Sequence, residues 1–146
     1  MLSMTKKSGY GLIAMCYLAG LKKGERASAR TIAETFGIPV SLLMNVLKQL
    51  CAEGFVQSTR GAHGGYSITR EPREMPLIDV MEALEGPVTL AACITNGSSK
   101  PSNETCSLLS KCPIAEPVYR VHQKIRGVLS DMTLEDIITE SKEDVS

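Results

Sequence analysis

Hydrophobic residues recur every three or four positions near the start of the chain, with polar residues between them. The recurrence runs from Tyr10 to Leu21 and stops at the polar stretch 22–28 (KKGERAS). Because one face of an α-helix presents residues at this spacing, the pattern predicts an amphipathic first helix. The predicted apolar face consists of Tyr10, Ile13, Ala14, Tyr17, Leu18 and Leu21.

Two further helices are predicted on either side of a short turn. Ser28 suits the N-cap of a helix that reaches Phe36, and Gly37 suits its end because glycine readily adopts left-handed conformations. A third helix is expected over residues 40–53, closed by Gly54. Two short helices around such a turn are typical of a helix-turn-helix, although the helices alone fit a small helical bundle better. The apolar face of the third helix consists of Leu43, Val46, Leu47 and Leu50.

The segment after the third helix favours the helix-turn-helix. Residues 55–59 (FVQST) and 66–69 (YSIT) have the composition of strands, and the residues between them, 60–65 (RGAHGG), are rich in glycine. Two strands joined in this way predict a β-hairpin. Three helices followed by a hairpin with a basic residue at its base make a winged helix. We therefore predict a mainly α fold with a small β-hairpin wing.

The second half of the chain is predicted to hold one long loop between helices. Pro76 suits the first turn of a short helix that Gly86-Pro87 ends. Residues 87–112 contain few large apolar residues and are expected to form a loop, whose length indicates a functional or mobile segment. A long helix is expected after Pro113, and residues 133–136 (TLED) resemble a capping box that opens a last short helix.

The long helix carries an apolar stripe with a repeat close to 3.5 residues, which suits packing against a partner helix. The stripe consists of Val118, Val121, Ile125 and Val128. The sequence thus predicts three parts. Residues 1–86 form a winged helix-turn-helix domain, residues 87–112 a cysteine-bearing loop, and residues 113–146 a long dimerisation helix with a short C-terminal helix.

Charge is distributed unevenly along the chain, although the net charge is zero. Residues 1–80 hold ten Lys/Arg and six Asp/Glu, and residues 81–146 hold six and ten. A basic first half indicates an anionic partner there. No apolar run approaches the ~18 residues of a membrane span, and the N-terminus lacks the pattern of a signal peptide. We therefore expect a cytoplasmic protein with no membrane partner.

Several short motifs together resemble one protein family. Gly37-Ile38 before the third helix, Gly54-Phe55-Val56 after it, and Arg60-Gly61 with Gly64-Gly65-Tyr66 in the hairpin are similar to the Rrf-two (Rrf2) family of winged-helix transcriptional regulators, which includes IscR, NsrR and RirA. Residues 4–6 with Tyr10, residues 76–80 and residues 132–137 resemble further family stretches, so the resemblance spans nearly the whole chain. It implies a homodimer formed through the long helix and, in several members, an iron–sulfur cluster held by three loop cysteines.

A winged helix of this kind is expected to place its third helix in the major groove of double-stranded DNA, and a dimer reads a near-palindromic operator. Asn and Gln pair with adenine edges, and Lys and Ser bind bases or phosphates. On the wing, a basic side chain suits the backbone or the minor groove, and glycine allows close approach. The alternative is that these polar residues only solvate the surface. The candidate DNA-binding residues are Ser41, Asn45, Lys48, Gln49, Arg60, Gly61, His63, Gly64 and Gly65.

The five cysteines fall into two settings. Cys16 and Cys51 lie within predicted helices and are interpreted as packing residues. Cys93, Cys106 and Cys112 lie in the polar loop, where nothing is expected to bury them, which indicates a ligand or a redox role. Thiolates are soft ligands that suit iron–sulfur clusters or zinc. The family resemblance favours an iron–sulfur cluster on these three cysteines, of the 2Fe–2S rather than the 4Fe–4S type.

Three cysteines leave a fourth ligand position unassigned. The resemblance points to a histidine three residues after the last cysteine or to an acidic residue of the partner's first helix, and this chain has Ala115 and Gly9 at those positions. Glu104 and Glu116 are substitutes in the sequence, as are an external thiol or water. His122 is expected to lie on the surface of the long helix rather than to act as a ligand.

The sequence therefore predicts a repressor or activator that responds to iron–sulfur cluster status in iron, cluster-assembly or nitrosative and oxidative stress. An alternative keeps the DNA-binding module and replaces the cluster with a reversible disulfide between Cys106 and Cys112. An enzyme or a cluster carrier is a third class. We expect no catalytic residues, because the sequence offers neither a phosphate-binding glycine loop nor a nucleophile with a neighbouring base.

Overall fold

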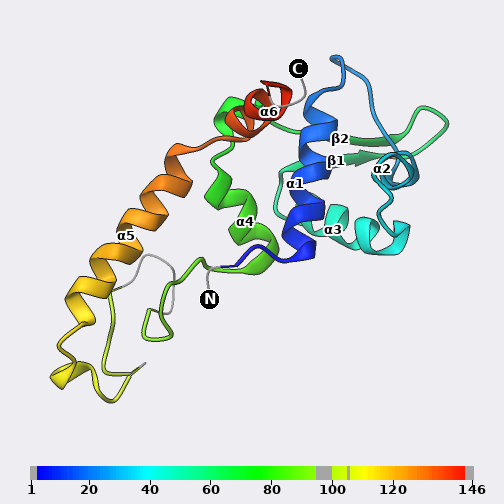
Figure 1. The fold of residues 1–146 in the computed structure, drawn as a ribbon. Helices are drawn as coiled ribbons and strands as arrows, with labels where there is room; N and C mark the ends of the chain where they lie inside the picture. Colours follow the sequence, from blue (N-terminus) through cyan, green and yellow to red (C-terminus); the bar gives the residue numbers. More distant parts are fainter. Residues whose placement is uncertain (1–2, 95–99, 105, 144–146) are drawn as a thin grey trace.

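Three helices and a two-stranded hairpin form one end of the molecule, and a long helix extends away at the other end (Figure 1). The computed structural model describes residues 3–94, 100–104 and 106–143. The predicted mainly α fold with a β-hairpin wing is confirmed. The elements, in order, are α1 (Lys6–Ala19), α2 (Ala29–Phe36), α3 (Val40–Ala52), β1 (Val56–Thr59), β2 (Gly65–Ile68), the 3-10 helix η1 (Pro72–Glu74), α4 (Leu77–Glu85), the 3-10 helix η2 (Leu109–Lys111), α5 (Ala115–Asp131) and α6 (Leu134–Glu143).

The helix-turn-helix forms as its capping residues predict. The Ser28 hydroxyl accepts a hydrogen bond from the Thr31 backbone N–H at 3.1 Å and so caps α2. Gly37 ends α2 with a φ of 68°, the left-handed conformation that favours glycine. The four predicted apolar positions of α3 are all buried.

The predicted apolar face of α1 is partly wrong. Ile13 lies at the surface with 36% of its area exposed, whereas Leu12 and Met15 are buried. The reason is that α1 packs against α3, α4 and β2 together, which rotates its buried face away from the stripe that periodicity alone selects. Gly11 lies on the side of α1 that contacts α4, since a Cβ there would lie 2.3 Å from Leu84 Cδ1 of α4.

The wing is an antiparallel hairpin whose second strand is paired on both edges. Gln57 pairs with Ser67 and Ser58 with Tyr66, so each strand lies within one residue of its predicted range. On its other edge, Tyr66 donates its N–H to the Ala27 carbonyl at 2.7 Å and accepts the Ala27 N–H at 3.1 Å. The segment before α2 thus holds the wing in place.

α4 and the α5–α6 junction are joined by a short backbone bridge. Leu77 N–H donates to the Met132 carbonyl at 2.8 Å, and Leu134 N–H donates to the Met75 carbonyl at 2.9 Å. The C-terminal end of α5 is thereby fixed at the start of α4. The predicted capping box forms, with Thr133 N–H donating to Asp136 Oδ2 at 2.8 Å.

α6 turns back onto the winged helix instead of continuing along α5 (Figure 1). It packs against α1 and η1, and its Leu134 is fully buried in their core. The predicted division into three parts stays a prediction. Across the described residues, no helix is both long and apolar enough to cross a membrane.

The start of α1 is tied to the end of α4 by one carboxylate. Ser8, a fully buried residue, donates its hydroxyl to Glu85 Oε1 at 2.6 Å, and the Thr5 hydroxyl donates to the same atom. These hydrogen bonds favour the charged carboxylate, so they hold the pKa of Glu85 below its usual value.

Gly65→Ala should destabilise the wing. Gly65 has a φ of 140°, and a Cβ there would lie 2.8 Å from the Ala27 carbonyl oxygen, a backbone atom that cannot turn aside. We expect the free energy of unfolding in urea to fall by about 1–3 kcal/mol. Gly9→Ala is the control, because its Cβ would meet nothing within 4 Å. An alanine in a helix should raise the free energy of unfolding by about 0.5–1 kcal/mol relative to glycine. Equal stability of Gly65→Ala and the wild type would contradict the close β2–Ala27 pairing.

Glu85→Gln should lower stability near neutral pH but not in acid. The folded-state pKa of Glu85 lies below its unfolded value, so its contribution is present above the unfolded pKa and is lost as the pH falls through the folded one. Because the carboxylate is exposed, we expect a difference below about 1 kcal/mol at pH 7. Urea unfolding of both proteins between pH 7 and 3 measures it. A stability difference as large at pH 3 as at pH 7 would contradict this contribution of the carboxylate.

Candidate nucleic-acid interface and cysteine loop

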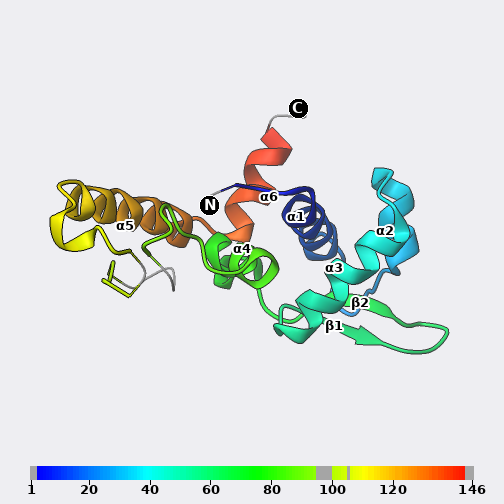
Figure 2. The ribbon, with the colours of Figure 1, turned by 90° about the horizontal axis from the view of Figure 1, so that it is seen from below.

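The outer side of α3 is exposed opposite its buried stripe. Ser41, Met44, Asn45 and Lys48 share this side, because they follow the spacing i, i+3, i+4, i+7. Periodicity therefore places three of the four predicted α3 residues correctly on the surface. α3 and the hairpin lie side by side at the end of the molecule opposite α5 (Figures 1 and 2).

Gln49, the fourth predicted residue of α3, is turned toward the protein. It is half-buried, and its Nε2 donates to the Ala83 carbonyl of α4 at 2.8 Å and to the Leu84 carbonyl at 3.3 Å. The sequence around Gln49 gives no signal of this contact, since its acceptors are 34 and 35 residues away.

The wing tip is exposed from Arg60 to His63. Gly61 has a φ of 113°, which favours glycine, and Gly64 approaches its own hairpin so closely that a Cβ would lie 2.2 Å from the Thr59 carbonyl oxygen. The glycines that the sequence assigns to the wing are therefore required by the tight backbone of the hairpin itself.

The outer side of α3 and the wing tip form one surface, here called the α3–wing face: Ser41, Met44, Asn45, Lys48 and residues 60–65. Residues 37–52 and 55–70, which build both elements, contain neither Asp nor Glu. Lys48 and Arg60 therefore give this surface a positive potential that no neighbouring carboxylate in these segments offsets. Such a surface attracts a polyanion.

The three loop cysteines are half-buried and are not gathered into one site. Cys93 precedes the segment 95–99, which lies outside the described residues, and Cys112 ends η2. Within the described ranges, no three His, Cys, Asp or Glu side chains are grouped closely enough to hold a metal ion. None of the five cysteines, all within those ranges, forms a disulfide. The donor chemistry of the loop fits an iron–sulfur cluster, and its arrangement in this structure does not.

Cys16 and Cys51 lie half-buried in α1 and α3, where they were expected to pack. Burial raises the pKa of both thiols, which keeps them protonated and unreactive at neutral pH. Their environment therefore does not suit metal ligands, which must be thiolates.

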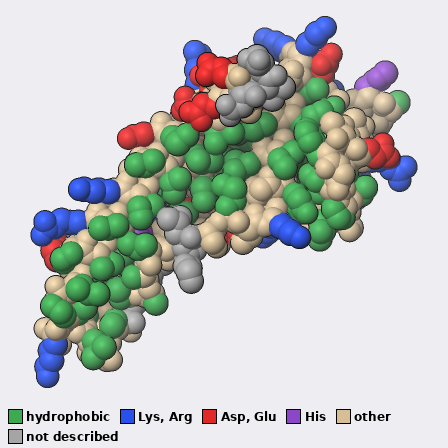
Figure 3. Space-filling model, viewed as in Figure 1, with side chains coloured by type: hydrophobic (Ala, Val, Ile, Leu, Met, Phe, Trp, Pro, Cys, Tyr) green, Lys and Arg blue, Asp and Glu red, His purple; other side chains and the backbone are tan. Residues whose placement is uncertain are grey.

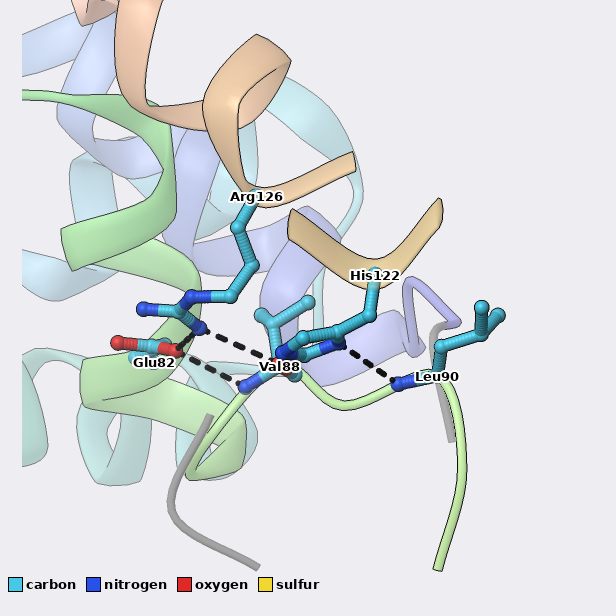
Figure 4. Close-up of polar contacts among 5 residues, drawn as sticks. All are labelled: Glu82, Val88, Leu90, His122 and Arg126. Atoms are coloured by element: carbon cyan, nitrogen blue, oxygen red, sulfur yellow. Dashed lines mark hydrogen bonds and ion pairs between the residues drawn. The ribbon is translucent and has the colours of Figure 1, made fainter. Parts of the chain in front are cut away.

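His122 is buried, and the expectation of a surface residue is wrong. Only 1% of its area is exposed, and its Nδ1 accepts the Leu90 backbone N–H at 3.3 Å (Figure 4). The segment that follows α4 covers this side of α5. The signal was present in the sequence, because His122 lies four residues after Val118 and three before Ile125, on the apolar stripe.

The substitutes for a fourth ligand lie at the surface. Glu104 and Glu116 are exposed, and Glu116 forms an exposed ion pair with Arg120 at 3.8 Å. Ala115 is the first residue of α5, and Gly9 lies in α1 with open space around it. The assignment of a fourth ligand stays open.

A second polar contact holds α5 on α4, and the sequence analysis missed it. Arg126 forms an ion pair with Glu82 and donates to the Val88 carbonyl at 3.2 Å, while Glu82 Oε1 accepts the Val88 N–H at 3.0 Å (Figure 4). The Arg126 and Glu82 side chains are only 18% and 27% exposed. No local pattern connects two residues that lie 44 positions apart.

A helix-turn-helix with a basic wing, joined to a long helix and a cysteine-bearing loop, defines a transcriptional regulator of the winged-helix class. The sequence model of the Rrf2 family, described as iron-dependent transcriptional regulator, matches residues 4–140. The chain belongs to this family, whose members are transcriptional regulators and not enzymes.

Solved structures with the same fold include two regulators with different names. CymR, described as the global cysteine regulator of B. subtilis, is 28% identical with a TM-score of 0.72, over 96% of this chain and 98% of that one. IscR of T. potens is 30% identical with a TM-score of 0.68, over 98% and 90%. The oxidized form of S. aureus CymR is 25% identical with a TM-score of 0.69, over 94% and 96%.

Proposed function

We propose that the chain is a homodimeric regulator that binds near-palindromic double-stranded DNA through the α3–wing face, with an affinity set by the state of its loop cysteines. The observation that carries the DNA-binding part is the exposed, acid-free α3–wing face. Membership in the Rrf2 family supports it.

Each residue of the α3–wing face has a distinct role in this proposal. Asn45 offers both a donor and an acceptor to an adenine edge in the major groove, with Ser41 one turn before it. Lys48 and Arg60 neutralise phosphates, and His63 at the wing tip reaches the backbone or the minor groove. Gln49 is left out, because its amide already donates to α4.

The second copy is proposed to cover the apolar side of α5. Val128 is 60% exposed and Val121 is 48% exposed. Beside them lies a hollow of about 400 Å³ between α5, α4 and the N-terminal segment, lined by Ser3, Met4, Met81, Ile125, Val128 and Leu129. Hydrophobic side chains run along α5 and continue over α4 on the face in Figure 3. Such a continuous apolar surface on a helix suits the same helix of a symmetric partner.

The loop cysteines are proposed as ligands of an iron–sulfur cluster. Cys93 lies on the α4 side of the loop, and Cys106 and Cys112 lie on the α5 side. The occupancy of such a cluster would depend on the supply of iron and on exposure to oxidants. Because the three side chains are not gathered in this structure, holding a cluster requires the loop to change its conformation. That change is what links the cluster to DNA affinity.

A thiol sensor without a cluster is the second candidate. Two consecutive turns keep the stretch between Cys106 and Cys112 short. Leu109 N–H donates to the Cys106 carbonyl at 3.2 Å, and Cys112 N–H donates to the Leu109 carbonyl at 3.3 Å. Oxidation by a peroxide would join their sulfurs, with two electrons and two protons passing from the thiols to the peroxide.

Asn45→Ala should weaken binding to a DNA site selected by the wild type from a random-sequence pool. Loss of an amide that reads a base edge costs about 1–3 kcal/mol, or roughly 5- to 150-fold in dissociation constant, with little effect on unrelated DNA. Arg60→Ala should weaken binding to both DNAs and reduce the slope of affinity against salt by about one ion. Fluorescence anisotropy measures both effects.

The matched controls are Asn103→Ala in the cysteine loop and Arg120→Ala on α5, both exposed residues away from the α3–wing face. They should leave DNA binding unchanged. Specific binding that survives Asn45→Ala and Arg60→Ala together would refute the proposed interface.

The chain isolated without oxygen should be brown and should contain iron and acid-labile sulfide. Cys106→Ser should lose the colour and the iron, whereas Cys51→Ser should keep both, because Cys51 is a protonated residue of α3. Metal and sulfide analysis with visible spectra measures this. A colourless, iron-free wild type whose Cys106 and Cys112 lose two hydrogen atoms in peroxide by mass spectrometry would favour the thiol sensor instead.

Val128→Glu should convert the dimer into monomers, because the interface would then bury an unpaired carboxylate. Ser130→Glu is the control, since Ser130 is an exposed residue on another side of α5. Analytical ultracentrifugation gives the mass of each species. A Val128→Glu chain that remains a dimer would show that another surface forms the contact.

A further inference from the structure

The last turn of α4, residues 82–85, accepts hydrogen bonds from four separate parts of the chain. From α1, the Ser8 hydroxyl donates to Glu85, as does that of Thr5. From α3, Gln49 donates to the carbonyls of residues 83 and 84. From α5, Arg126 donates to Glu82, and so does the Val88 N–H at the start of the cysteine loop.

The chemistry of a helix end explains why so many donors converge there. The last carbonyls of a helix have no partner within the helix, and this end carries partial negative charge. Glu82 and Glu85 add two carboxylates, so donors from neighbouring elements stabilise the turn. The conformation of the turn therefore depends on where those elements lie.

Arg126, which reaches this turn from α5, also holds the first part of the cysteine loop, together with His122. Arg126 donates to the Val88 carbonyl at 3.2 Å, and one helical turn earlier His122 accepts the Leu90 N–H at 3.3 Å (Figure 4). Leu90 lies only three residues before Cys93. A loop that moves to bring Cys93 toward the other cysteines must therefore disturb these contacts.

On the other side of the turn, Gln49 lies one helical turn after Asn45 on α3. Its two acceptors are the backbone carbonyls next to Glu82, so a tilt of this turn moves the anchor of α3. The contacts thus lead from the loop to α3 in steps. Leu90 is bonded to His122, and Val88 to Arg126 and Glu82. Gln49 of α3 is bonded to residues 83 and 84, which follow Glu82 in the same turn.

We propose that the last turn of α4 transmits the state of the cysteine loop to α3, with Arg126 and Gln49 as its positioning residues. This inference rests on the proposed function, in which the loop is the sensor and α3 reads DNA. With the Arg126 contacts intact, the turn and α3 keep the arrangement seen here. When the loop rearranges, Val88 leaves Glu82, the turn shifts, and α3 follows through Gln49.

The test compares two loop states of the full chain by the ratio of their DNA dissociation constants. One state is reconstituted without oxygen with ferrous iron and sulfide, and the other is stripped with a chelator. We expect the wild type to show a ratio of about tenfold, within the usual range of coupling between two sites. In Arg126→Met and in Gln49→Met the ratio should fall to within about twofold of one. Arg126→Lys, which keeps a charged donor, should restore part of the ratio.

Two matched controls lie on α5. Arg120→Met removes a guanidinium from an exposed ion pair whose side chains are 71% and 69% exposed, and Gln123→Met removes an exposed amide. Both should keep the wild-type ratio. A ratio that survives unchanged in Arg126→Met and Gln49→Met while the wild type responds would overturn this inference and leave the proposed function standing. A wild-type ratio of one would overturn the cluster-sensing part of the proposed function and this inference with it.

Amide hydrogen exchange of the DNA-free, metal-free chain gives a second readout. In Arg126→Met, residues 86–94 should exchange faster, because Arg126 no longer fixes the Val88 carbonyl or the Glu82 carboxylate that accepts the Val88 N–H. α3 should exchange faster as well. Arg120→Met should match the wild type in both regions. Faster exchange confined to the loop, with α3 unchanged, would show that the turn does not reach α3.

Discussion

The packing of α4 against α1 is closest at Gly11, which has no side chain. Leu84 fills the space where a Cβ of Gly11 would be, and the Ser8–Glu85 hydrogen bond also joins the two helices. The rest of the molecule is arranged around α4: α3 is anchored to its last turn, and α5 lies antiparallel to it. The backbone bridge at Pro76 ties the C-terminal end of the long helix to its start. α4 therefore lies between the helix proposed to read DNA and the long helix, and contacts both.

The two ends of the molecule differ in the way their charges are arranged. The segments that build the α3–wing face lack carboxylates, whereas the acidic residues gather in the second half of the chain. An acid-free reading surface attracts a polyanion, and the carboxylates elsewhere disfavour binding in other orientations. The zero net charge thus conceals an uneven charge distribution, with one face that favours a polyanion.

Local patterns predicted the elements well, because caps and periodicity act over a few residues. Ser28, Gly37 and the apolar stripe of α3 are examples. Ile13 is exposed and Gln49 is bonded to α4, and for both residues the deciding neighbours lie far away in the chain. For the same reason the ion pair between Arg126 and Glu82 left no trace in the sequence. His122 differs, because its place on the apolar stripe of α5 was a local sign of burial.

The backbone bridge between Pro76 and Thr133 has a consequence for the geometry of binding. It fixes one end of α5, while the middle of α5 is held by the side chains of His122 and Arg126. If those side-chain contacts were released while the backbone bridge held, α5 would be free to pivot about the bridge. In the proposed dimer both long helices would pivot alike, and the separation of the two DNA-reading helices would change. The quantity under control would then be the number of base pairs between operator half-sites, rather than the identity of any base.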